Sequence, residues 1–278
     1  MIRETYVLTV RELKKWVGRR GTFLVSLVTP LAWLALFGKS LNFVNMFSSG
    51  ITGSQFVNPS IAQQYIDQTL LKLFGTTNYF NFLTTGMFVV FAFFQSVFGG
   101  VNIVFEKRLG SMNRLRLTPA PRASIYLAKM LATIVRIVFY ETVLLLIALA
   151  LGFSPSWSVA GFVAAGVALA VLAAGFVSIF EAIGFNVDNQ EIMFSIVNLI
   201  NLPLMFASPV LFPVKQMPWW LQDIARVNPL TYAVDIVRYN LLGLHTVNYY
   251  EAWGILVAVS AVFLVVGMIA SLRVLENY

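Results

Sequence analysis

The residues best able to do chemistry in this chain are a few ionisable side chains inside long apolar segments. Arg136 and Glu141 interrupt one segment, and Glu181 lies near the end of the next. A charge at mid-bilayer costs about 2.5–3.5 kcal/mol or more, so such groups usually face protein or water. Arg136 and Glu141 are separated by roughly 140° around a helix and point apart, so Arg136 is expected to meet Glu181 or to extend toward the cytoplasm. A polar patch on a transport path is possible, but we favour a structural role.

Composition excludes a soluble protein. Of the 278 residues, 59% are hydrophobic and only 11% are charged, less than half of the roughly 25% found in soluble domains. One soluble core cannot bury that much apolar surface, so lipid must solvate much of it. The chain has no Cys and one His, His245. Disulfides are therefore excluded, and no metal site is predicted.

Six apolar segments could cross the roughly 30 Å hydrocarbon core of a bilayer. Pro203 and Pro209 predict a break near the outer end of the fifth segment. The predicted fold is an all-α integral membrane protein with a single transmembrane domain, 1–278. Its predicted spans are residues 21–38, 82–105, 127–151, 159–180, 192–212 and 252–272.

The distribution of basic residues predicts the orientation. Of 19 Lys and Arg residues, 13 fall on the side that holds the N-terminus, the loop after the second span and Arg273, and five fall on the other side. The positive-inside rule then places both termini in the cytoplasm. The expected location is the cell membrane of a prokaryote, with the chain multi-pass. The net charge of +7 follows from the same rule, so no nucleic-acid partner is expected.

The first patterned segment outside the spans is residues 3–19. Tyr6, Val10, Leu13 and Val17 share one helical face, and the bases lie on other faces. Such an amphipathic helix suits the lipid interface on the cytoplasmic side. The alternative is a basic tail that only sets the topology.

The second patterned segment is the basic loop from Glu106 to Arg122. Its residues Leu109, Met112 and Leu115 form a small apolar stripe, which predicts a short helix. Such a helix is unstable alone in water, so the stripe needs a protein groove or lipid to cover it. Thr118-Pro119 predicts the start of the next helix. The alternative is a solvated loop.

The third patterned segment, 213–245, is rich in proline, so one continuous helix is excluded. Trp219 and Trp220 suit an outer aromatic belt. We expect a helical hairpin, 217–226 and 229–242, that dips into the outer interface and caps a path. In the first outer loop, a helix that starts at Pro59 and an ordinary packed loop element are equally expected.

These motifs resemble the membrane (permease) subunit of type-2 ATP-binding-cassette (ABC) transporters, nearest the drug-resistance and polysaccharide-export permeases. The resemblance covers nearly the whole chain, although Thr84-Thr85-Gly86 and Ala207-Ser208-Pro209 depart from the common pattern. Its most specific motifs are Glu106-Lys107-Arg108-Leu109-Gly110 with Leu115, Thr118-Pro119 and Arg122, and Asn228-Pro229-Leu230-Thr231-Tyr232-Ala233-Val234-Asp235 with Arg238, and the pairs Phe212-Pro213 and Met217-Pro218.

The resemblance implies a role for each segment. Residues 3–19 would be a connecting helix, 106–117 a coupling helix seated in a groove of a separate ATPase, and 213–245 the re-entrant outer gate. Two permeases would pair with each other and with two ATPases. The docking residues would be Glu106, Lys107, Arg108, Leu109, Gly110, Met112, Arg114, Leu115 and Arg116. The gate residues would be Pro213, Pro218, Trp219, Trp220, Asn228, Pro229, Tyr232, Asp235 and Arg238.

The expected function is the membrane subunit of an ATP-driven exporter for an amphipathic, lipid-like, drug-like or glycan substrate. The chain lacks a phosphate-binding motif, because Gly38-Lys39-Ser40 follows a span and lacks the first Gly. ATP and Mg are therefore expected on the partner, and the chain itself is not an enzyme. The alternative is an ion-coupled transporter or channel, which predicts an inverted repeat that the sequence does not show. An intramembrane enzyme is disfavoured, because its catalytic residues could only be His245 and Asp235.

Overall fold

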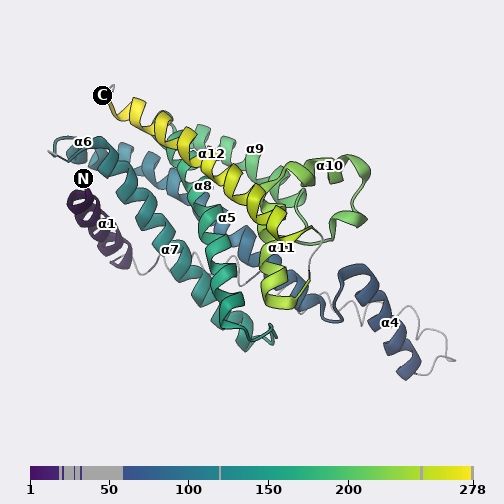
Figure 1. Cartoon of the computed structure of the whole chain (residues 1–278). Coiled ribbons are helices and arrows are strands. Elements are labelled where there is room, and N and C mark those ends of the chain that lie inside the picture. Colours follow the sequence, from purple (N-terminus) through teal and green to yellow (C-terminus); the bar gives the residue numbers. More distant parts are fainter. Residues whose placement is uncertain are drawn as a thin grey trace.

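The computed structural model describes residues 1–18, 59–118, 120–244 and 247–276, together with Gly21, Val28 and Ala32. Every regular element in these ranges is a helix (Figure 1). The helices are α1 (Ile2–Val17), α4 (Pro59–Phe74), α5 (Tyr79–Arg108), α6 (Ser111–Arg116), α7 (Arg122–Ala150), α8 (Val159–Asn186), α9 (Gln190–Phe206), the 3₁₀ turn η1 (Val214–Gln216), α10 (Trp219–Val227), α11 (Pro229–Leu242) and α12 (Tyr249–Glu276).

Four of the described helices are long and apolar enough to cross a membrane, namely those containing α5, α7, α8 and α12. They occupy the predicted spans 82–105, 127–151, 159–180 and 252–272. The predicted first span, 21–38, lies outside the described residues apart from three single positions. The predicted count of six spans is therefore not tested by the structure. The chain is a multi-pass helical membrane protein.

The predicted fifth span, 192–212, corresponds to the shorter α9. At 17 residues it is about 25 Å long, less than the bilayer core. Pro203 lies within α9 and the helix ends at Phe206, so the predicted boundary at residue 212 is too late. The next residues turn because Pro209 cannot continue the helix.

The start of the third span also differs from the prediction. The helix α7 begins at Arg122, with Pro121 as its N-cap, rather than after Thr118. The hydroxyl of Thr118 donates to the carbonyl of Leu115 at 2.6 Å, so it ends α6 instead of capping α7. The residue before a proline avoids the helical conformation, and Ala120 precedes Pro121. A helix is therefore free to form only beyond that point.

Helix α8 lies at the centre and packs against α5, α7, α11 and α12. Glycines allow close approach where α8 crosses α5. A Cβ at Gly100 would lie 2.0 Å from the carbonyl oxygen of Phe180, and one at Gly184 would lie 2.4 Å from that of Gly100. Small residues at crossings are typical of membrane helices, because they let backbones approach closely.

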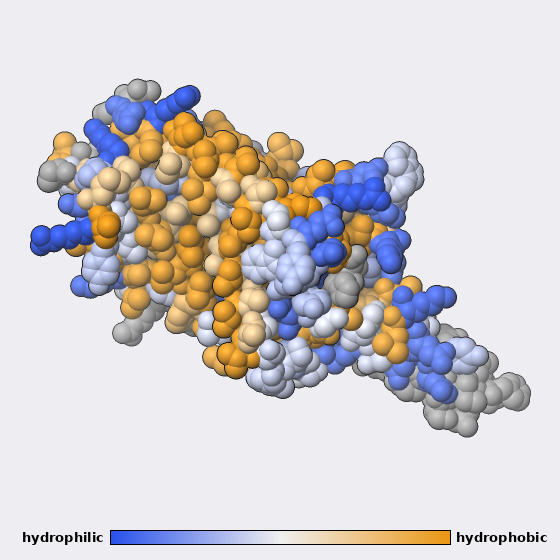
Figure 2. Space-filling model, in the orientation of Figure 1, coloured by the Kyte–Doolittle hydropathy of each residue, from blue (hydrophilic) through white to orange (hydrophobic). Residues whose placement is uncertain are grey.

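The molecule has two distinct ends. Both termini and α6 lie at one end, which we term the basic end, and α4, α10 and α11 lie toward the other, the hairpin end (Figure 1). Apolar side chains cover the flank between them, and hydrophilic side chains gather toward the ends (Figure 2). A belt of this kind is the surface that a bilayer solvates.

Candidate functional site

Helix α1 packs against α7 through a face that carries Thr9 and Trp16. The hydroxyl of Thr9 donates to the carbonyl of Ala128 at 3.5 Å, and the indole N–H of Trp16 donates to the hydroxyl of Tyr140 at 3.0 Å. On the predicted apolar face, Val10 and Leu13 are half-buried, whereas Tyr6 and Val17 are exposed. An apolar edge that this chain leaves uncovered is suited to lipid.

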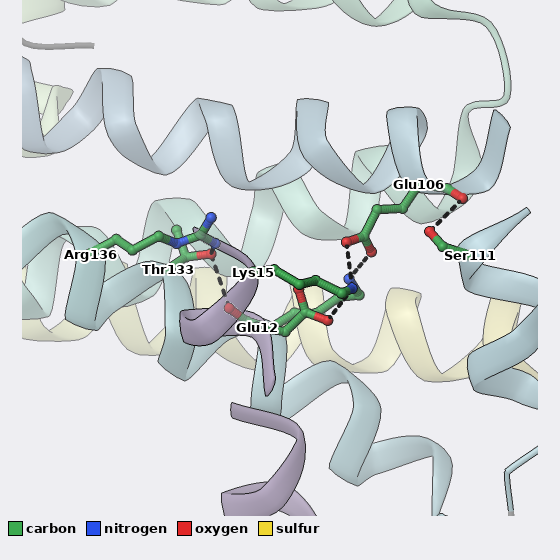
Figure 3. A network of polar contacts seen from close by, with 7 residues as sticks. Glu12, Lys15, Glu106, Ser111, Thr133 and Arg136 are labelled. Atoms are coloured by element: carbon green, nitrogen blue, oxygen red, sulfur yellow. Dashed lines mark hydrogen bonds and ion pairs between the residues drawn. The ribbon is translucent and has the colours of Figure 1, made fainter. Parts of the chain in front are cut away.

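A charged junction joins three helices at the basic end (Figure 3). The carboxylate of Glu106 on α5 forms an ion pair with Lys129 on α7 and accepts a second contact from Lys15 on α1 at 3.4 Å. Lys15 also pairs with Glu12 at 2.9 Å. Glu106 is therefore turned toward neighbouring helices of its own chain.

Arg136 lies further along α7, beyond Lys129 and Thr133. Its Nε donates to the carbonyl of Ala132 at 3.1 Å, and one terminal nitrogen donates to the hydroxyl of Thr133 at 2.8 Å. Thr133 in turn donates to the carbonyl of Lys129 at 2.9 Å, which connects Arg136 to the charged junction (Figure 3).

The expected ion pair between Arg136 and Glu181 is not formed within the described part of the chain. The two residues instead line one small cavity of about 90 Å³. Because Arg136 turns to Thr133 and to its own backbone, their charges act across this cavity rather than in contact. Arg136 and Glu141 do not meet either, as their helical spacing predicts.

Helix α6 lies directly after α5. Some residues of the predicted apolar stripe are buried and others are exposed. Met112 and Leu115 are 0% and 2% exposed and belong to the core of this chain. The prediction that these two residues contact an ATPase is therefore corrected. A helix of six residues is unstable alone, so it packs its apolar face against the nearest part of its own chain. Leu109 and Leu117 remain exposed.

The other predicted docking residues divide in the same way. Lys107 turns inward, donating to the carbonyls of Phe185 and Val187 at 2.9 and 3.0 Å and pairing with Asp188. Arg108 is exposed and donates to the side chain of Gln190 at 2.7 Å.

Three residues complete the predicted docking set. Gly110 has a φ of +68° and makes the turn between α5 and α6, a conformation that favours glycine. Arg114 is exposed. Arg116 ends α6, and its side chain lies outside the described residues.

The predicted outer gate forms a hairpin of α10 and α11. Asn228 caps α11 by accepting from the backbone N–H of Leu230 at 3.0 Å, and its amide donates to the carbonyls of Leu204 and Ala207 at 2.7 and 3.2 Å. Pro229 occupies the first turn of α11, where a missing N–H costs nothing. One side chain thus starts α11 and ties it to the end of α9.

Arg238 fastens α11 to α5. Its guanidinium donates to the carbonyls of Phe82 and Val210 at 3.2 and 3.1 Å and lies over the ring of Phe82. Burial lowers the pKa of Arg238, and the charge of Asp235 partly opposes this shift. Asp235 also accepts from the backbone N–H of Val247 at 3.1 Å, so it holds the chain that follows α11.

The remaining predicted gate residues lie at the edge of the hairpin. Trp219 and Trp220 begin α10 and are exposed, as is Pro218, while Pro213 is buried. The hydroxyl of Tyr232 donates to the carbonyl of Arg226 and closes the turn between α10 and α11. Burial raises the pKa of Tyr232. His245 lies outside the described residues.

A cavity of about 480 Å³ opens between α5, α7 and α9. Aromatic rings and amides line it together with Arg136. Sequence reasoning missed the amides of this lining. The aromatic and amide residues of its lining are Trp16, Phe91, Phe94, Phe98, Tyr140, Phe194, Gln95, Asn102, Asn198 and Asn201.

Sequence reasoning also missed Glu12, Lys15 and Thr133 as members of the charged junction. The spacing of Glu12 and Lys15 suggests only a local pair along one helix. The contact of Lys15 with Glu106 depends on how α1 docks, for which the sequence carries no local signal.

Comparison with known families identifies the chain. The model of the ABC-2 type transporter family matches residues 3–242, a stretch that runs from the first turn of α1 to the end of α11. The chain belongs to the ABC-2 type transporter family. ABC-2 permeases work with an ATP-binding-cassette ATPase, and the fold described above corresponds to the membrane subunit of such a pair.

Named relatives agree with this assignment. The chain is 27% identical over 244 residues to a putative transport permease, ycf38, of Porphyra purpurea, covering 86% of this chain and 74% of the relative. It is 25% identical over 240 residues to the protein of that name from Cyanophora paradoxa, with the same coverage. It is 25% identical over 203 residues to the daunorubicin resistance ABC transporter permease protein DrrB1 of Streptomyces coeruleorubidus, covering 73% and 71%.

Proposed function

We propose that this ABC-2 permease is the membrane subunit of an ATP-driven exporter, with an ATPase docked on α6 and the α10–α11 hairpin as the outer gate. One observation carries the proposal: α6 buries Met112 and Leu115 in the core, while Arg114 on α6 and Leu117 directly after it stay exposed. One face of this helix, the free face, is therefore open to a partner. The other, the fixed face, packs against the spans.

Force on α6 has a direct route into the membrane. The junction of Glu106 links the end of α5 to α1 and α7, and Lys107 links it to the connection between α8 and α9. A push from an ATPase would therefore move several helices together, as rigid-body transitions require.

The same helices hold the gate. Asn228 ties α11 to α9, and Arg238 ties α11 to α5. Movement of α5 and α9 would loosen or tighten both ties, which couples the basic end to the hairpin end through packed, hydrogen-bonded elements.

The complete transporter is proposed to contain two copies of this chain and two ATPases, which carry ATP and Mg. It lies in a cell membrane, that of a prokaryote in our proposal, with both termini in the cytoplasm. The aromatic and amide cavity suits an amphipathic substrate, whether lipid-like, drug-like or glycan. The drug-resistance name of one relative supports a drug-like substrate.

Charge reversal on the free face of α6 tests the proposal. The double variant Arg114→Glu with Leu117→Glu, reconstituted with the ATPase that co-purifies with the wild-type chain, should lose ATP-driven transport. The control Lys72→Glu reverses one charge on exposed α4 and should retain it. Full ATP-driven transport by the double variant would contradict the docking assignment. Transport driven by a proton gradient without ATP would favour the ion-coupled alternative.

A further inference from the structure

A second recess, separate from the aromatic cavity, lies between α7 and α8. It has a volume of about 380 Å³ and is lined almost wholly by apolar side chains. Val138, Val163 and Val167 on its rim are exposed. The recess is thus a groove that opens on the apolar flank of the molecule.

The groove holds one carboxyl group, that of Glu141. This residue is 8% exposed, and both of its oxygens lack a hydrogen-bond partner within the described part of the chain. Arg136 is the nearest base along α7, but it turns to Ala132 and Thr133 and lines other cavities. Buried carboxyl groups are normally paired or hydrogen-bonded. Glu141, like Glu181 in the cavity near Arg136, lacks such a partner in the described part of the chain.

With the outer end of α7 placed at the headgroup level, Glu141 lies well below the lipid headgroups. It precedes the end of α7 at Ala150 by nine residues, which corresponds to about 13 Å along the helix. A phospholipid amine is held at the headgroup level, whereas a small lipophilic amine partitions into the apolar region. The depth of the carboxyl group therefore favours a small amine over a lipid headgroup.

We propose that this groove binds a small lipophilic amine from the bilayer, with its ammonium paired to Glu141 and its apolar body against the valines of α7 and α8. The volume falls within the range of roughly 300–1,000 Å³ for small-molecule sites. An ammonium would supply both the charge and the hydrogen-bond donors that Glu141 lacks.

This inference adds a ligand class to the proposed exporter. Its test measures binding in the absence of any ATPase. Failure of the amine site would therefore leave the docking of α6 untouched, and failure of α6 docking would leave the amine site untouched.

The experiment compares two probes of the same three-ring shape, cationic 9-aminoacridine and uncharged anthracene, on the full chain in phosphatidylcholine nanodiscs. Glu141→Gln should weaken binding of the cation by about tenfold or more and leave that of anthracene unchanged. Val163→Trp, which fills the rim, should weaken both. The control Glu251→Gln neutralises an exposed carboxylate on α12 and should change neither.

Two results would overturn the proposal. One is equal affinity of wild type and Glu141→Gln for 9-aminoacridine. The other is displacement of bound 9-aminoacridine when phosphatidylethanolamine is added to the nanodiscs, because the occupant of the groove would then be a lipid headgroup.

Discussion

The carboxylate of Glu106 on α5 forms an ion pair with the ammonium of Lys129 on α7, and Lys15 of α1 contacts the same carboxylate at 3.4 Å. One side chain thus connects three helices next to α6. The Lys129 side chain is only 8% exposed, so this junction is a buried ion pair whose loss leaves a charge without compensation. Such pairs fix an arrangement more than they add stability.

Replacement of Glu106 should therefore destabilise the chain. In Glu106→Gln the buried ammonium of Lys129 loses its partner, which costs about 3 kcal/mol, the low end of the range for broken buried pairs, because Glu106 keeps some exposure. Thermal unfolding in detergent should show a clear fall in Tm. Adding Lys129→Met should restore part of the loss, since the unpaired ammonium at the junction is then removed.

The matched control is Asp223→Asn, which breaks the exposed pair with Arg226 on α10. An exposed pair contributes about 0–1 kcal/mol, so its Tm should stay near that of the wild type. Equal effects of Glu106→Gln and Asp223→Asn would contradict the role of the junction.

The division of α6 into a fixed and a free face makes two opposite predictions. Met112→Ala removes a fully buried side chain and should lower stability by about 2–5 kcal/mol. Leu117→Ala changes an exposed side chain and should alter stability by less than about 0.5 kcal/mol, while weakening co-purification of the ATPase. The measurements are thermal unfolding and pull-down; the reverse pattern would mean that the two faces were assigned the wrong way round.

The crossing of α5 and α8 depends on the absence of a side chain at Gly100. Gly100→Ala places a methyl group against the backbone of Phe180 and should destabilise the chain by about 1–3 kcal/mol through overpacking. Gly254→Ala on α12 meets no atom within 4 Å and should be neutral or stabilising by up to about 1 kcal/mol, because alanine favours helix. If the two variants had the same Tm, the close crossing would be refuted.

Asn228 should contribute more than an ordinary helix cap. Asn78 caps α5 in the same way, accepting from the N–H of Phe80 at 3.0 Å, and its loss should cost about 1 kcal/mol. Asn228→Ala loses the cap and also leaves the carbonyls of Leu204 and Ala207 without their donor, which adds about 1–3 kcal/mol. The two variants are compared by thermal unfolding. A cost for Asn228→Ala no larger than that for Asn78→Ala would exclude a tie between α9 and α11.

Much of the fold follows from local sequence signals. The long apolar segments predict the positions of α5, α7, α8 and α12, because a helix is the simplest way to satisfy the backbone in lipid. The hairpin helices are also predictable, since Pro218 and Asn228-Pro229 mark their starts. The boundaries at α7 and α9 were missed because several prolines compete there and local rules do not rank them.

The sequence by itself determined that this chain is a membrane protein. It also determined the approximate positions of the helices and which segments carry the basic and capping residues. Only the tertiary structure decided which face of each helix is covered. Periodicity places Leu109, Met112 and Leu115 on one stripe, but lipid, a partner and the chain's own core are all apolar and leave the same pattern. The packing of α6 on α5 buries Met112 and Leu115 and exposes Leu109, and the docking of α1 gathers Lys15, Glu106 and Lys129. Both depend on contacts between residues distant in sequence, which local spacing does not encode.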